Sequence, residues 1–242
     1  MRQSRIHTTQ LISPQCSVEL TDSAAHYLSR VLRLSKGDAV TLFNGDGKDY
    51  AGDIVDIKPR QVLIRVTGSS IPGNESPLKI TLVQGVCRGE RMDYALQKAT
   101  ELGVVCIQPL VSRRVGVRLD QKRQVKRLAH WQKVVISACE QCGRALVPEV
   151  KAPLMLSDWI SGMDQYRQVV LDPESEVTLS GLSVGDKPIS ILVGPEGGFA
   201  DEELELLVAN GVVAVSLGPR VLRTETAGAA AIAVLQAIGG DF

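Results

Sequence analysis

Residues 189–199 read ISILVGPEGGF, a mostly apolar run that passes directly into a glycine-rich turn. Similar apolar runs occur before and after it, and helix-forming segments separate them. These runs are KITLVQGV, VVCIQPL, RQVVLD and GVVAVSLG. Strands that are apolar throughout and alternate with helices are typical of a parallel sheet covered on both faces. The sequence therefore predicts an α/β domain around this stretch.

Residues 1–72 have a different rhythm, with short strand candidates that are separated by turns. The strand candidates are CSVEL, AVTLFN, DYAGDIVDI and QVLIRV. In the segment TDSAAHYLSRVLR, apolar residues recur at helical spacing and predict one helix. Residues 68–77 (GSSIPGNESP) have the composition of a linker. We therefore expect a small β-barrel over residues 1–72 and the α/β domain over residues 73–242.

The composition of the 242-residue chain is ordinary for a globular protein, with 44% hydrophobic and 22% charged residues. Its longest run without a charged residue, Thr226 to Gly240, is shorter than the roughly 20 residues of a membrane span. The first residues show no apolar segment that would mark a secretory signal. The five cysteines are an odd number and are expected to be reduced thiols. We therefore expect a cytoplasmic protein without membrane contact.

The net charge of zero conceals a strong asymmetry along the chain. Residues 79–151 hold 14 Lys and Arg against 6 Asp and Glu, whereas residues 152–242 hold 4 against 13. Such a distribution favours a face that meets a polyanion. A solvated helix face explains a single basic run equally well, so both interpretations stay open at this point.

Two glycine-containing loops follow predicted strands, where parallel α/β sheets bind their ligands. One is Gly194 to Gly198, and the other is LGPRVLRTETA, residues 217–227. Neither matches a Walker A loop or a GxGxxG motif. The three histidines are scattered and Cys139-x-x-Cys142 lacks a second ligand pair, so the sequence indicates neither a metal site nor a catalytic triad.

Five segments together resemble one family. They are HYLSRVLR, RGERMDYALQKATELGV, ACEQCGR, LVGPEGGF and LGPRVLRTETA. Their order is similar to that in the 16S ribosomal RNA uracil-N3 methyltransferases, the RsmE family, which belongs to the SPOUT class of S-adenosylmethionine-dependent methyltransferases. The resemblance covers nearly the whole chain. It implies a PUA-like barrel, a SPOUT domain with a deep trefoil knot, and a homodimer.

The resemblance also implies where S-adenosylmethionine binds. The cofactor would lie against the end of RQVVLD and the two glycine-containing loops, where backbone groups can hold a neutral aromatic base in a dry crevice. The implied cofactor-binding residues are Leu171, Leu192, Gly194, Glu196, Gly197, Leu217, Gly218, Leu222, Thr224 and Thr226.

The implied reaction transfers a methyl group to N3 of a uridine, which becomes a good nucleophile only after it loses its proton. Arg220 and Arg223 are expected to stabilise the resulting anion. Glu225 is expected to accept the proton or to orient an arginine, and a capping role at the start of the last helix is an equal alternative. No metal is needed for this chemistry.

The RNA, as 16S rRNA or the small ribosomal subunit, is expected to contact arginines of both domains. Arg30 and Arg33 are predicted to lie one turn apart on the first helix. The complete set of candidates is Arg5, Arg30, Arg33, Arg88, Arg91, Arg113 and Arg114.

Three alternatives remain from the sequence. A SPOUT enzyme with a different RNA target has the same class of fold, a non-catalytic RNA-binding or ribosome-assembly factor would use the barrel alone, and a nucleotide-binding α/β enzyme would bind ATP or NAD. The helix predicted near Thr226–Gly240 is uncharged and rich in alanine, so it must be covered on most sides. We expect it in the homodimer interface, although a central helix of a monomer would have the same composition.

Overall fold

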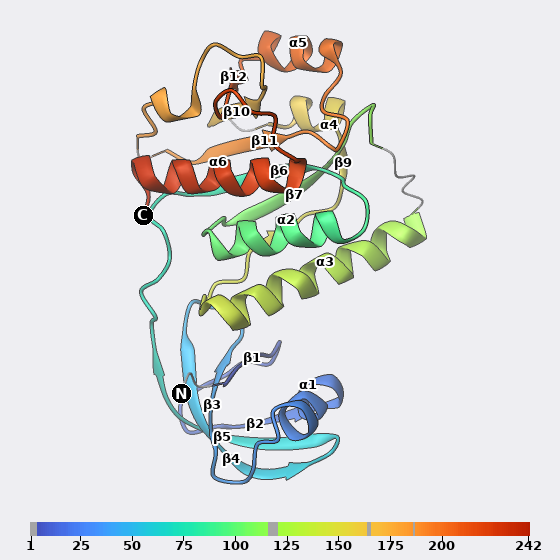
Figure 1. The fold of residues 1–242 in the computed structure, drawn as a ribbon. Coiled ribbons are helices and arrows are strands. Elements are labelled where there is room, and N and C mark those ends of the chain that lie inside the picture. The colour runs from blue at the N-terminus through green and yellow to red at the C-terminus, as the bar shows by residue number, and fades with distance from the viewer. Residues whose placement is uncertain (1–3, 116–120, 164–165, 186) are drawn as a thin grey trace. The chain divides into compact units, whose positions relative to one another are not determined.

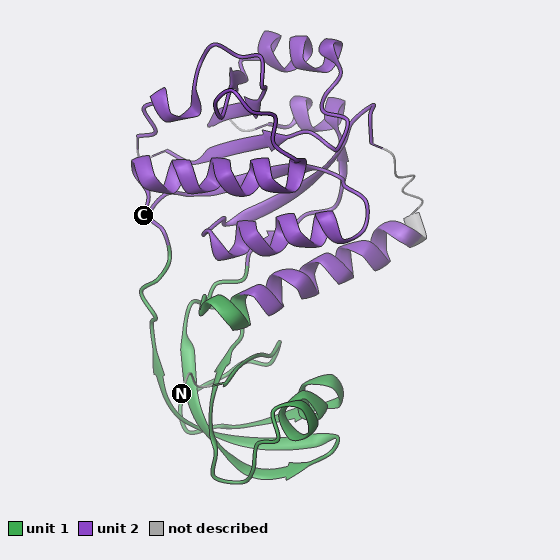
Figure 2. Cartoon of the chain, viewed as in Figure 1, with its two compact units in different colours: residues 1–75, 139–147 green, residues 76–138, 148–242 purple. Residues whose placement is uncertain are grey.

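The computed structural model describes residues 4–115, 121–163, 166–185 and 187–242. The chain divides into two compact units (Figure 2). Unit 1 comprises residues 1–75 together with residues 139–147, and unit 2 comprises residues 76–138 and 148–242. The inclusion of residues 139–147 in unit 1 has no signal in the sequence, because this segment follows a long stretch of unit 2.

Unit 1 is built on a curled five-stranded sheet (Figure 1). In sheet order its strands are β1 (Ser4–His7), β3 (Ala39–Phe43), β4 (Asp49–Lys58), β5 (Gln61–Ser70) and β2 (Ser17–Thr21). The first pair is parallel and the others are antiparallel. Among the described residues no ladder joins β1 to β2, so the sheet curls without pairing its two edges.

The concave core of unit 1 explains its strand pattern. Alternate residues such as Val18, Leu20 and Leu42 point inward, where they pack with Ala25 and Leu28 of the helical segment. That segment is shorter than predicted. It consists of α1 (Asp22–His26) and a π-helical turn, η1 (Tyr27–Val31).

The predicted placement of Arg33 on this helix is therefore wrong. The helical turns end at Val31, and Arg33 follows them with a φ of 54°. Arg30 and Arg33 are thus not stacked one turn apart.

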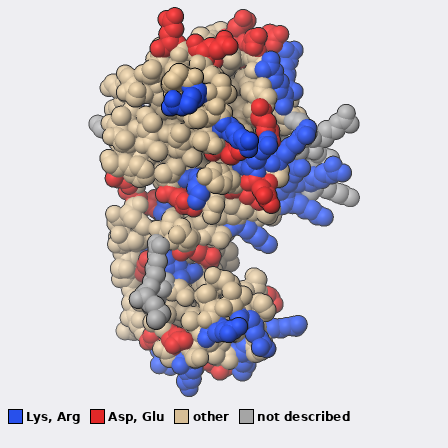
Figure 3. Space-filling view, viewed as in Figure 1, with Lys and Arg blue, Asp and Glu red and all other residues tan. Residues whose placement is uncertain are grey.

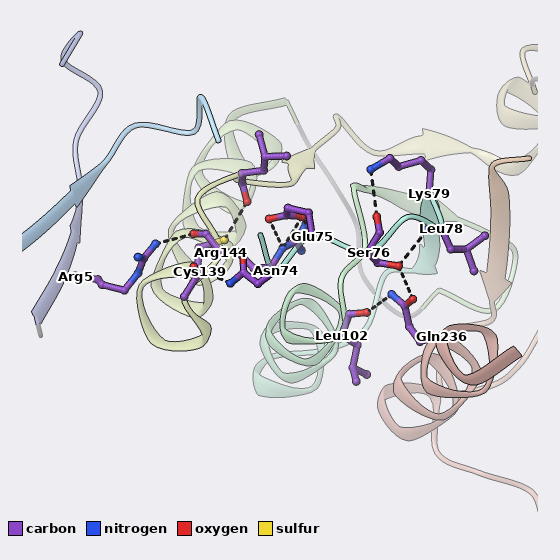
Figure 4. Close-up of polar contacts among 12 residues, drawn as sticks. Arg5, Asn74, Glu75, Ser76, Leu78, Lys79, Leu102, Cys139, Arg144 and Gln236 are labelled. Atoms are coloured by element: carbon purple, nitrogen blue, oxygen red, sulfur yellow. Dashed lines mark hydrogen bonds and ion pairs between the residues drawn. The ribbon is translucent and has the colours of Figure 1, made fainter. Parts of the chain in front are cut away.

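The segment 139–147 is tied to the rest of unit 1 by a buried arginine (Figure 4). The Arg144 guanidinium donates to the Glu75 carboxylate at 2.6 Å, and Asn74 Nδ2 donates to the Gly143 carbonyl at 3.0 Å. Arg5 donates to the Arg144 carbonyl at 3.1 Å and pairs with Asp49. These contacts join β1 and residues 74–75 to the segment 139–147.

Unit 2 contains the predicted parallel sheet, and the α/β prediction is confirmed. Every pair of its strands is parallel. In order the strands are β12 (Val213–Val215), β10 (Arg167–Leu171), β11 (Ile189–Val193), β6 (Ile80–Gly85), β7 (Cys106–Val111) and β8 (Glu149–Val150), and β9 (Leu154–Met155) also pairs with β7.

Helices cover both faces of this sheet, which is why its strands are mostly apolar. α2 (Glu90–Glu101) and α6 (Thr224–Gly239) pack together over one face, where Gly228 of α6 lies against Leu82 (Figure 1). α4 (Leu156–Ser161) and α5 (Asp201–Ala209) bury residues against the opposite face, where Val83 packs. α3 (Gln121–Cys142) runs beside α2, and a short 3-10 turn, η2 (Leu179–Gly181), contacts α6.

The end of α6 is fixed by one buried glutamine (Figure 4). The Gln236 amide accepts from Ser76 Oγ at 2.6 Å and donates to the Leu102 carbonyl at 2.7 Å. This pair of bonds connects α6 to the first residue of unit 2 and to the end of α2. In the described ranges, no helix has the length and apolarity to cross a membrane.

Candidate functional site

The carboxyl ends of β10, β11 and β12 meet at one edge of the sheet of unit 2, and the loops that follow them line a cavity of about 350 Å³. The loop after β12 continues into the first turn of α6. A cavity of this size at this edge is typical of a small-molecule site in an α/β fold. Among the residues predicted from the sequence, those that line it are Leu171, Gly194, Glu196, Leu217, Gly218, Arg220, Leu222, Arg223, Thr224 and Glu225.

Three predicted cofactor residues lie elsewhere. Leu192 is fully buried in the core beneath α4 and α5, because its side chain points to the opposite face from its neighbour Val193. Gly197 lies against the Arg114 side chain, and Thr226 is exposed on α6.

The cavity also has walls that the sequence did not indicate. Leu171 is followed by Asp172 and Pro173, and Arg91 of α2, predicted to contact RNA, lines the cavity as well. Of the other lining residues, Pro195, Gly198, Val221 and Ala227 belong to the two loops predicted to hold the cofactor, and Val193 and Val215 end the strands before them. Their positions next to predicted residues in the same loops were the available signal.

Close backbone packing shapes the first loop. A Cβ on Gly194 would lie 3.0 Å from backbone atoms of Gly198 and Phe199, and one on Gly85 would lie 2.5 Å from the Pro195 nitrogen. In the second loop, Gly218 has a φ of +95° and open space beside it. Glycine at these positions therefore keeps the loops folded tightly and keeps the crevice open.

A buried hydrogen-bond chain joins the two loops from below. Gln84, at the end of β6, donates from Nε2 to Thr224 Oγ1 at 2.9 Å, and Thr224 Oγ1 donates to the Gly194 carbonyl. Gln84 is fully buried. The Cys87 thiol lies beside this chain, and burial raises its pKa to about 11. Thr224 thus belongs to the wall as a link between loops, a role that its sequence context did not suggest.

Glu196 lines the cavity and is held by two arginines, one just before α2 and one in its first turn. It accepts from the Arg88 backbone N–H at 2.9 Å and from Arg91 Nη1 at 3.5 Å. Burial alone would raise the pKa of Glu196, but these backbone hydrogen bonds and the two arginines outweigh it and lower the pKa. The carboxylate is therefore an anchor for this loop.

Arg113 and Arg114 support the same loop from the other side. Arg114 Nη1 donates to the carbonyls of Gly197 and Phe199, at 3.1 and 3.0 Å. Arg113 pairs with Glu202 of α5 at 3.0 Å. Figure 3 shows acidic side chains gathered over α5 and basic side chains over the first half of α3. The predicted RNA-contacting arginines of unit 2 thus already have protein partners.

Arg5 departs most from its expected role. Its side chain is only 9% exposed and pairs with Asp49, and its guanidinium lies 4.9 Å from the centre of the Phe43 ring. The predicted RNA contact of Arg5 is contradicted by this burial. Arg30 and Arg33 are exposed, as a phosphate contact requires.

The three candidate catalytic residues converge on the cavity. Arg220 and Arg223 are exposed at its rim, and Arg223 is the residue that precedes α6. Glu225 lies in the first turn of α6, and its Oε2 is buried without a hydrogen-bond partner among the described residues. A helix N-terminus stabilises such a carboxylate.

The cysteine pair at the end of α3 serves packing. Cys139 is buried and Cys142 half-buried, and burial raises the pKa of the Cys139 thiol to about 12. Within the described part of the chain, no group of three or more His, Cys, Asp or Glu side chains is arranged to hold a metal ion.

Both units match models of known domains. Residues 74–236 match the RNA methyltransferase domain, and residues 20–67 match the RNA methyltransferase PUA domain. This chain belongs to the RNA methyltransferase family. One relative in the family, the ribosomal RNA small subunit methyltransferase E of Buchnera aphidicola, is 34% identical over 92% of this chain and 88% of its own length.

Two solved structures of RNA methyltransferase relatives resemble the whole chain. A methyltransferase from Legionella pneumophila in complex with S-adenosylmethionine is 40% identical, with a TM-score of 0.96. The ribosomal RNA small subunit methyltransferase E from Neisseria gonorrhoeae, bound to S-adenosylmethionine, is 37% identical, with a TM-score of 0.93. In both comparisons all of each chain is covered.

Proposed function

We propose that this RNA methyltransferase family member transfers a methyl group from S-adenosylmethionine to N3 of a uridine in 16S ribosomal RNA. The observation that carries the proposal is the cavity at the ends of β10, β11 and β12, in a chain that resembles two methyltransferases solved with bound S-adenosylmethionine. The cavity fits the cofactor because its walls combine apolar side chains with glycine backbone, and a Cβ on Gly218 would project into open space beside it.

The residues that would hold the cofactor are those of the three loops. Leu217, Gly218 and Leu222 present backbone groups, whereas Leu171 and Val193 supply apolar surface. When bound, S-adenosylmethionine supplies an electrophilic methyl group. The roles of Leu192, Gly197 and Thr226 are then indirect, since they do not line the cavity.

The catalytic roles follow from the positions of three charged residues. Arg220 and Arg223 stabilise the negative charge that spreads onto the uracil oxygens as N3 loses its proton. Glu225, which lines the same cavity, accepts that proton or orients one of the two arginines. Arg91 lines the cavity, Arg88 bonds the lining residue Glu196 through its backbone, and Arg113 and Arg114 contact α5 and the loop after β11. Together they contribute positive potential toward RNA phosphates.

We place this activity in the cytoplasm, where ribosomes assemble. The direct test is to map modified uridines in ribosomal RNA from cells with and without this protein. Loss of one N3-methyluridine in the small-subunit RNA is expected. A non-catalytic assembly factor would leave every modification in place, and the purified protein would then not bind S-adenosylmethionine in calorimetry.

We also propose that the protein acts as a homodimer through α6 and the loop before it. Val221, beside the cavity, is 80% exposed, and Ala230 and Ala233 of α6 are only half-buried. Sedimentation should give a dimer for the natural protein and a monomer for Ala230→Asp or Ala233→Asp. Ala209→Asp, at an exposed position of α5, is the matched control. A natural monomer with full activity would contradict this assembly.

The trefoil knot is the remaining structural proposal. Ser216 donates to the Val177 carbonyl at 2.8 Å and accepts from the Leu179 N–H at 2.9 Å. These bonds support a path in which the segment before α6 passes through the loop that contains η2. A crystal structure traced continuously from residue 172 to residue 223 would test this path.

A further inference from the structure

A groove in unit 1 presents aromatic and basic side chains far from the chemistry of unit 2 in the sequence. It is open and has a volume of about 530 Å³. Its walls come from the helical segment and from the turn between β4 and β5, and they include Asp22, His26, Tyr27, Val31, Pro59 and Arg60. Tyr27 is 42% exposed and Val31 is 59% exposed. The groove therefore offers an exposed aromatic ring next to an exposed aliphatic side chain.

The backbone of this helical segment is locally unusual. The Leu32 N–H bonds the Tyr27 carbonyl at 2.9 Å, an i to i+5 contact that widens the turn carrying Tyr27. Asp22 before the segment and Arg33 after it both have positive φ, at 51° and 54°. π-Helical turns and left-handed non-glycine residues occur frequently at functional sites.

The charge around the groove is available to a partner. Arg60 lines the groove, and Arg30 and Arg33 lie in and just after the helical segment that forms one of its walls. All three are exposed, and within the described residues none of them has an ion-pair partner. Asp22 is the acidic residue of the wall. Exposed guanidinium groups beside an aromatic ring match a phosphate backbone with a base attached, whereas an acidic peptide would have no use for the exposed face of the ring.

We propose that this groove binds an unpaired nucleobase of the RNA substrate, stacked on Tyr27. The flanking phosphates contact Arg30, Arg33 and Arg60, and the Asp22 carboxylate accepts a hydrogen bond from an N–H of the base. The proposal rests on the proposed function, because it takes the substrate to be RNA. It adds a second point of attachment, one that reads a base outside the catalytic cavity.

The test compares Tyr27→Ala with Tyr27→Phe, which keeps the stacking face. The probes are a fluorescein-labelled single-stranded fragment of small-subunit ribosomal RNA and heparin, a polyanion without bases. Tyr27→Ala should weaken RNA binding about tenfold, the usual effect of losing one stacked base. Tyr27→Phe should retain the natural RNA affinity, and neither change should alter heparin binding. Tyr166→Ala is the matched control. It removes a tyrosine of similar exposure (49%) that precedes β10, at the end of the strand away from the cavity, and it should not change RNA binding.

Thermal unfolding and S-adenosylmethionine affinity are measured on every variant, so that a misfolded protein is recognised. Equal RNA affinity in Tyr27→Ala and the natural protein, or equal losses for RNA and heparin, would overturn the stacking site. If Tyr27→Ala loses RNA affinity but no methyl transfer is found in the natural protein, the groove stands and the proposed function fails. If the natural protein methylates RNA and Tyr27→Ala binds RNA normally, the proposed stacking site is wrong and the proposed function stands.

Discussion

Two groups of arginines, one in each unit, are held in opposite ways. In unit 2, Arg91 and Arg113 pair with acidic side chains, and Arg114 bonds the carbonyls of the loop that lines the cavity. In unit 1, Arg30 and Arg33 are exposed with no ion pair in the part of the chain that is described. The first arrangement fixes a binding site before a ligand arrives, which lowers the ordering cost of binding. The second keeps positive charge for a polyanion whose position is not fixed in advance.

The largest effect should come from filling the preformed cavity. Gly218→Val places a side chain in the open crevice at a φ of +95°, and Gly194→Val forces its Cβ against backbone 3.0 Å away. Each should lower S-adenosylmethionine affinity by about 100-fold or more, because overpacking and backbone strain act together. Calorimetry measures this.

Gly211→Val is the control, since Gly211 has a φ of +88° and open space but lies in the turn after α5. If Gly211→Val and Gly218→Val bound the cofactor equally, the cavity would not be the cofactor site.

Removing a catalytic arginine should affect rate and leave the preformed cavity intact. Arg220→Ala and Arg223→Ala are expected to lower the turnover number by about 100- to 1,000-fold, because they stabilise charge that develops only in the transition state. The affinity for S-adenosylmethionine should change little. Single-turnover methylation and calorimetry on the same samples separate the two. Parallel losses in rate and cofactor affinity would place these arginines in the cofactor wall instead.

A smaller effect is expected from the hydrogen-bond chain beneath the loops. Gln84→Leu leaves Thr224 without its buried donor and should weaken S-adenosylmethionine binding by about tenfold, in line with the loss of one buried hydrogen bond. Gln108→Leu is the matched control. Gln108 is equally polar, is 5% exposed on the adjacent strand and bonds the Ala152 carbonyl away from the cavity. Both variants should lose similar thermal stability, and a similar loss of cofactor affinity in both would contradict a specific role for Gln84.

The smallest effect concerns the salt dependence of RNA binding. Arg30→Gln with Arg33→Gln should reduce the slope of log affinity against log salt by about one to two units, since each released phosphate contact contributes nearly one. Arg113→Gln with Arg114→Gln should reduce it less, because these side chains already interact with Glu202 and Asp201. Fluorescence anisotropy at several salt concentrations measures both slopes. Equal slopes for the two pairs would remove the distinction between the units.

The parts of the fold that could be predicted are those encoded by local patterns. The strand Ile189–Val193 and the loops around Gly194 and Gly218 were predictable, because apolar runs and glycines report directly on buried strands and tight turns. β1, β8 and β9 are too short or too polar to produce such a pattern.

What failed depends on contacts between distant residues. Arg5 is a basic residue in a polar segment, and nothing local distinguishes a surface arginine from one buried by Asp49 and the Arg144 carbonyl. The sequence also does not show toward which face of the sheet a residue of a buried strand points. Leu192 was therefore assigned to the cavity, although its neighbour Val193 lines it. Arg33 was misplaced because the widened turn at Tyr27 ends the helix early.

The pairing of Arg144 with Glu75 has a consequence for how the protein is made. Synthesis on a ribosome delivers the strands of unit 1 first, yet Arg144 and the segment around it emerge only after most of β6, α2, β7 and α3. Until then the Glu75 carboxylate and the guanidinium of Arg5 lack these bonds. Nascent unit 1 therefore stays incompletely packed while residues 76–144 are translated, and a gene fragment that stops at residue 75 would encode a sheet without the segment that completes its packing.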